Sequence, residues 1–166
     1  MSETSPWAQW VPPLVTVLGW GIVNYQTNRR EARKEDRALI DAAKKLVVET
    51  GAAARRYMAD AHRNPDTETD IKLALQQLEI ELNRLPGYTA NVALVEAMAA
   101  FGDASTGGDF ESANRRSKTS ADPAMQALAS SRNELLAQLE LEFVLRHSSW
   151  ARRWKARRDQ KRLVKP

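Results

Sequence analysis

The chain opens with an apolar stretch, Trp7 to Tyr25, whose only ionisable side chain is the phenol of Tyr25. The polar, basic segment NRREARKEDR follows from Asn28. A transmembrane helix needs about 20 mostly apolar residues, and Pro12 to Asn28 supplies 17, or roughly 25 Å of helix. We therefore predict a short transmembrane helix. The alternative is a helix that lies on the membrane surface or is buried in a soluble protein.

Aromatic and basic residues at the ends of this segment predict its orientation. Trp7, Trp10 and Tyr25 lie where interfacial aromatic residues anchor a span, and Trp20 lies near its middle. No Lys or Arg precedes the span, whereas several follow it at once: Arg29, Arg30, Arg33, Lys34 and Arg37. Because positive residues remain on the cytoplasmic side, we expect the N-terminus outside and the body in the cytoplasm, at a bacterial inner membrane.

Four stretches of the body carry apolar residues at intervals of three and four, which is the period of one helix face. We expect helices over about 31–63, 67–85, 89–101 and 123–162. The first continues directly from the anchor. The residues that form these faces are Leu39, Ala43, Leu46, Thr50, Ala53 and Tyr57; Ile71, Leu75, Leu78, Leu82 and Leu85; Val92, Val95, Met98 and Phe101, which are expected to face in; and Met125, Leu128, Leu135, Leu139, Phe143, Arg146, Trp150 and Trp154.

Capping residues predict where these helices begin and end. Thr67 and Asp70 resemble a capping box for the second helix, and Asp122 before a proline is a strong start for the fourth. Gly102 is a plausible end of the third. In the second helix Leu73 and Ile80 lie off the main stripe, so we expect that helix to be covered on two sides.

The lengths of these helices predict an all-α architecture. A long antiparallel pair, about residues 29–63 and 123–162, forms its frame, and the two shorter helices lie at the distal end. Residues 1–28 are then the outward N-terminus and anchor, 29–149 the cytoplasmic domain, and 150–166 a basic tail that returns to the membrane. A polar stretch at 103–121 is expected to be a mobile loop, whose Arg115, Arg116 and Lys118 form a solvated turn.

Positive charge is concentrated at both ends of the predicted hairpin. Residues 38–145 hold 11 Lys or Arg and 16 Asp or Glu, a net of −5, although the whole chain carries +4. We expect the tail to lie on an anionic leaflet, with nucleic acid or plain solvation as alternatives. The residues expected to contact lipid or phosphate are Arg29, Arg30, Arg33, Trp150, Arg152, Arg153, Trp154, Lys155, Arg157, Arg158, Lys161 and Arg162.

The residues needed for catalysis or cofactor binding are scarce. The chain has no cysteine, and its only histidines, His62 and His147, are far apart. No glycine-rich phosphate loop and no metal-ligand spacing is present. We therefore expect neither an enzyme nor a metal or cofactor site.

Several segments together resemble a known group of proteins. These are the apolar span ending in Gly19-Trp20, the segment NRREARKEDR, a helix with LIDAAKKL, and a final helix with RNELLAQLELE. The arrangement is similar to small single-pass bacterial membrane proteins of uncharacterised function, often encoded in prophages or mobile islands. The resemblance implies membrane anchoring and, by association, phage or defence biology. It implies no functional residues.

The function expected from these features is that of a membrane-anchored interaction protein. The helical stripes favour a homo-oligomer or another protein as partner, with the tail on anionic lipid. One alternative is a membrane-perturbing effector or exclusion factor. A second is a membrane-tethered nucleic-acid binder, whose affinity would fall steeply with salt.

Overall fold

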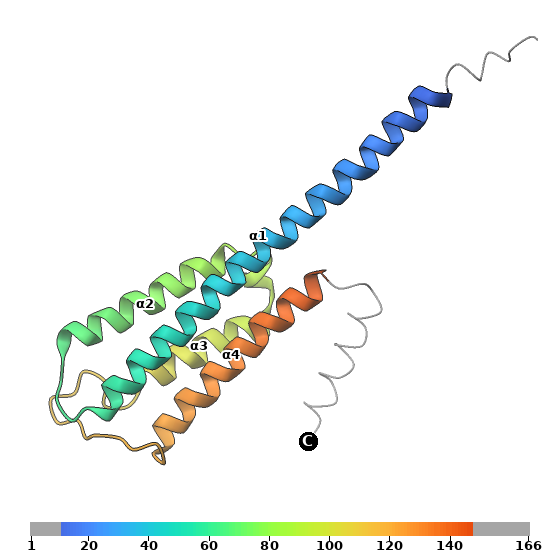
Figure 1. Cartoon of the computed structure of the whole chain (residues 1–166). Helices are drawn as coiled ribbons and strands as arrows, with labels where there is room; N and C mark the ends of the chain where they lie inside the picture. The colour runs from blue at the N-terminus through green and yellow to red at the C-terminus, as the bar shows by residue number, and fades with distance from the viewer. Residues whose placement is uncertain (1–10, 148–166) are drawn as a thin grey trace, which may run out of the picture. The chain divides into compact units, whose positions relative to one another are not determined.

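The computed structural model describes residues 11–147 (Figure 1). In chain order the helices are α1 (Val11–Ala59), α2 (Pro65–Asn83), the 3₁₀ helix η2 (Tyr88–Ala90), α3 (Val92–Thr106) and α4 (Pro123–His147). No strand occurs in this part of the chain. The chain divides into two compact units, residues 1–36 and 37–166, and α1 contributes to both. The all-α prediction is therefore confirmed.

Helix α1 is continuous from the apolar segment into the body, as the pattern predicts. Between residues 11 and 147, no helix is both long enough and apolar enough to cross a membrane. In the predicted span, Asn24, Gln26 and Asn28 interrupt the apolar run after Val23.

Four helices pack around one core in the second unit (Figure 1). Helix α1 is antiparallel to α4, since Lys44 contacts Glu140 whereas Gly51, further along α1, lies against Arg132. Helices α2 and α3 lie alongside this pair, so placing them at its distal end was wrong. The fully buried side chains of the core include Ile40, Val47, Ile71, Leu78, Leu82, Leu94, Phe101, Leu135 and Leu139.

Side chains at the helix starts explain the observed boundaries. The Asn64 side chain accepts a hydrogen bond from the Thr67 amide at 3.1 Å, so α2 begins at Pro65 and the predicted cap at Thr67 was wrong. The predicted Asp122 cap is confirmed, because its carboxylate accepts from the Ala124 amide at 2.9 Å. Helix α3 continues through Gly102 to Thr106, and the loop before α4 is correspondingly shorter than expected.

Not every apolar residue expected in the core is buried. Val92 is 65% exposed and Val95 38% exposed, because α3 turns Leu94 and Ala97 toward the core together with the expected Phe101. In α2, Leu73 and Ile80 are 56% and 52% exposed. The second covered side expected for α2 is therefore not covered within the described part of the chain.

Candidate functional site

Exposed aromatic and basic side chains occur on the part of α1 that precedes the bundle. Trp20 is 73% exposed and Tyr25 61% exposed. Arg29, Arg30 and Arg33 are exposed as well, and the Arg29 guanidinium lies 5.2 Å from the centroid of the Tyr25 ring. Exposed aromatic rings next to cations are typical of surfaces that bind lipid headgroups or other phosphates. We call Trp20, Tyr25, Arg29, Arg30 and Arg33 the α1 basic surface.

The other residues predicted for the membrane site lie outside the described residues. They are Trp7 and Trp10 of the anchor, and Trp150, Arg152, Arg153, Trp154, Lys155, Arg157, Arg158, Lys161 and Arg162 of the tail. Their role remains a prediction.

Further along α1, basic side chains form ion pairs with another helix of the bundle. Lys44 and Arg37 both bind the Glu140 carboxylate of α4, Arg37 at 3.0 Å. The hydrogen bond from Lys44, and then that from Arg37, lowers the pKa of Glu140. Arg37 also lies 5.0 Å from the Phe143 ring. These contacts connect α1 to α4, so Arg37 belongs to the bundle rather than to the α1 basic surface.

A buried polar cluster joins the end of α1 to the start of α2. Glu68 is 3% exposed and accepts a hydrogen bond from the Tyr57 hydroxyl. It also accepts two from Arg63, whose Nε and Nη2 each lie 3.0 Å from a carboxylate oxygen. The Arg63 bonds are the main reason that the pKa of Glu68 is lowered. The Arg115 guanidinium lies 3.5 Å from the centroid of the Tyr57 ring. Every polar group of the acid is thus engaged by the protein itself, which favours a structural role.

The loop between α3 and α4 caps the last turn of α1. The final carbonyls of a helix have no partner within the helix. Here Arg115 Nη2 donates to the Tyr57 carbonyl, the Lys118 amide to that of Met58 at 3.0 Å, and the Ser117 hydroxyl to that of Ala59 at 2.7 Å. Arg115 is only 7% exposed, so the solvated turn expected for it was wrong.

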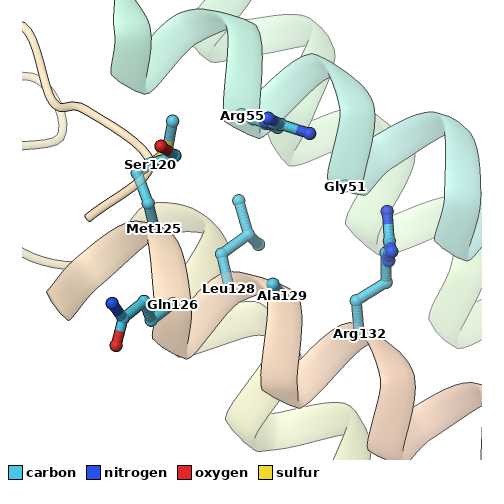
Figure 2. A pocket seen from close by; sticks show the side chains of 8 residues that line it. All are labelled: Gly51, Arg55, Ser120, Met125, Gln126, Leu128, Ala129 and Arg132. Carbon is cyan, nitrogen blue, oxygen red and sulfur yellow. The ribbon is translucent and has the colours of Figure 1, made fainter. Parts of the chain in front are cut away.

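A pocket of about 200 Å³ lies between α1 and the first turns of α4 (Figure 2). Its apolar wall comes from Met125, Leu128 and Ala129. Figure 2 shows Arg55 on α1 and Arg132 rising from α4 beside Gly51. The remaining lining residues, Ser120 and Gln126, contribute a hydroxyl and an amide.

Gly51 allows this arrangement of the pocket. A Cβ at residue 51 would lie 2.9 Å from Cδ of Arg132, so a larger residue would displace the arginine. Sequence reasoning missed the pocket, because its residues come from two segments, 51–55 and 120–132, that are far apart in the chain. The one available signal was Gly51 itself, because a glycine inside an otherwise regular helical segment often marks close packing.

No group of His, Asp or Glu side chains between residues 11 and 147 could hold a metal ion. The chain was also compared with known proteins. No protein-family model, no curated protein and no solved structure matches it.

Proposed function

We propose that the protein is a membrane-attached helical interaction protein. Its N-terminal segment and α1 basic surface contact an anionic membrane, and its four-helix bundle engages a protein partner. The observation that carries the proposal is the exposed pair Trp20 and Tyr25, with the exposed Arg29, Arg30 and Arg33 following on the same helix. The resemblance to small bacterial membrane proteins supports it and favours a role in phage or defence biology.

The electrostatic contribution can be set against ordinary binding energies. Each Lys or Arg near an anionic leaflet contributes about 1 kcal/mol. The three arginines of the α1 basic surface would therefore strengthen binding by roughly 3 kcal/mol, or about 150-fold. The basic residues of the tail would add to this.

Exposed apolar side chains support the second half of the proposal. Leu73 and Ile80 lie two helical turns apart on the outward side of α2, more than half exposed. A second copy of the chain would cover them, in line with the homo-oligomer expected from the sequence. The oligomeric state of the L73Q/I80Q variant, measured by light scattering, tests this point. If the wild-type chain is already monomeric, self-association through α2 is rejected.

Vesicle binding tests the membrane contact. Full-length protein is sedimented with vesicles of phosphatidylcholine alone and with vesicles that also contain phosphatidylserine. We expect binding to the anionic vesicles, weakened strongly in the R29Q/R30Q/R33Q variant. The matched control is K45Q/R56Q/R84Q, which removes the same charge from exposed positions of the bundle.

Two outcomes would contradict this proposal. Equal losses in the two triple variants would mean that only net charge matters. Tight binding to single-stranded DNA without binding to anionic vesicles would support the nucleic-acid alternative instead.

Cysteine labelling tests whether the attached segment also crosses the membrane. The chain has no cysteine, so single cysteines at Ser5 and at the exposed loop residue Ala113 can be probed in intact cells with an impermeant thiol reagent. Labelling of S5C alone supports a span with the N-terminus outside. If both sites label only after lysis, the segment is attached at the inner surface, and the predicted crossing is rejected.

A further inference from the structure

We propose that the pocket between α1 and α4 binds a small organic anion, namely a carboxylate or phosphate monoester attached to a small apolar group. The inference is independent of membrane attachment. It follows from the two arginines of the pocket, its apolar wall and its size.

The two arginines of the pocket have no carboxylate partner among the described residues, whereas several other arginines of the bundle do. Arg37, Arg63 and Arg84 each bind a Glu or Asp side chain. Arg55, by contrast, makes no hydrogen bond or ion pair to any described residue. Among the described residues, Arg132 donates only to the Asn133 amide oxygen, at 3.2 Å, and its Nε is buried without a partner there.

The surroundings of the two arginines also favour an anion. None of the eight described residues that line the pocket is acidic. Met125 and Gln126 belong to the first turn of α4, where the helix dipole is positive. The nearby Asp122 carboxylate is already used to cap the Ala124 amide. A guanidinium is the side chain best suited to bind carboxylate or phosphate through two parallel hydrogen bonds.

The size and the apolar wall limit the kind of ligand. Pockets for drug-sized molecules measure roughly 300–1,000 Å³, so one of about 200 Å³ suits a smaller compound. Met125, Leu128 and Ala129 provide an apolar surface beside the cations. Inorganic phosphate would use the arginines and leave this surface uncovered. We therefore expect benzoate and phenyl phosphate to bind more tightly than inorganic phosphate.

Nuclear magnetic resonance titration of the full chain tests the proposal. Benzoate, phenyl phosphate and inorganic phosphate are the probes, at constant ionic strength. We expect saturable shifts of the amide signals of Gly51, Gln126 and Ala129 with the two aromatic anions. The ratio of their affinities to that of inorganic phosphate separates recognition of the whole compound from capture of free phosphate.

Arginine variants identify the groups that bind. R55Q and R132Q should each weaken binding about tenfold or more, because hydrogen bonds to charged groups are among the strongest in proteins. The matched control is R56Q, which removes an exposed neighbour whose Nε donates to the Ala52 carbonyl. Since Arg55 is exposed, R55Q should fold normally even if R132Q does not.

The inference is overturned if the wild-type chain shows no saturable binding of either aromatic anion. It is also overturned if R56Q weakens binding as much as R55Q, because general electrostatic attraction would then explain the shifts. Binding of inorganic phosphate as tight as that of phenyl phosphate would reject the role of the apolar wall. Failure of the vesicle assay leaves these outcomes unaffected.

Discussion

The Tyr57→Phe variant isolates one hydrogen bond of the buried polar cluster. Tyr57 is 3% exposed, and its hydroxyl donates to the Glu68 carboxylate. Phenylalanine keeps the ring on which Arg115 stacks and which Phe110 meets edge-on, with ring centroids 5.1 Å apart. Only the hydroxyl is lost, so the change in stability measures what the hydroxyl contributes through its bond to Glu68 and its contact with the Glu111 backbone.

The magnitude follows from the partners that remain. A hydrogen bond to a charged group contributes about 1.5–3 kcal/mol. Because Arg63 still satisfies the carboxylate in the variant, we expect Tyr57→Phe to cost about 1.5 kcal/mol, at the lower end of that range. For a domain of this size that corresponds to a fall in Tm of about 5 °C or more.

Chemical unfolding followed by circular dichroism measures this cost. The urea midpoint should fall while the dependence of stability on urea stays unchanged. Tyr88→Phe is the matched control, since Tyr88 is 7% exposed and its hydroxyl bonds to no described residue. If Tyr57→Phe is no more destabilising than Tyr88→Phe, the bond to Glu68 does not stabilise the fold.

The same pair of variants predicts a difference at alkaline pH. Burial, and then the bond to Glu68, raises the pKa of Tyr57. Tyrosine in an unfolded chain has a pKa of about 10, and below that pH the protonated phenol stabilises the fold. This stabilisation is lost as pH rises through the higher pKa that Tyr57 has in the folded state. The wild-type chain should therefore lose more stability above pH ~10 than Tyr57→Phe does.

Three further predictions concern other contacts. The hydrogen bond from Lys44 lowers the pKa of Glu140, so the ionised Glu140 stabilises the fold fully above the pKa of about 4.3 that a glutamate has in the unfolded chain. This stabilisation is lost as pH falls through the lower pKa of the folded state. In acid unfolding, Glu140→Gln should therefore lose less stability than the wild-type chain over that pH range. Gly51→Leu should cost about 1–3 kcal/mol in urea unfolding by displacing Arg132, whereas Gly51→Ala should be nearly neutral because its helix propensity offsets a small shift of that side chain. Gly87 has φ +79°, so Gly87→Ala should lower the thermal midpoint by an amount that corresponds to about 1 kcal/mol; an unchanged midpoint would contradict this reading.

Local patterns predicted the helices well, but not always the faces that they bury. In α1, Ala43, Thr50 and Tyr57 are buried as expected. Between them, however, Val47 and Ala54 are buried more deeply than the expected Leu46 and Ala53. Both choices fit a helical period, and only the positions of α2 and α4 decide between them.

Long-range contacts account for what the sequence did not reveal. The residues around Arg115 are polar and charged, as in a solvated turn. Arg115 is nevertheless buried, because it donates a hydrogen bond to a carbonyl at the end of α1. The pocket likewise depends on Arg132 meeting a gap left by Gly51 on a distant helix. Neither contact has a local signature, since each depends on which helices become neighbours.

The capped end of α1 has a consequence for hydrogen exchange. Helix ends normally fray, so their amides exchange quickly and independently of the rest of the fold. In this protein the last carbonyls of α1 are held by Arg115, Ser117 and Lys118, some 58 residues further along the chain. Fraying of α1 and release of this loop are therefore one opening event, and their amides should exchange with a single shared free energy.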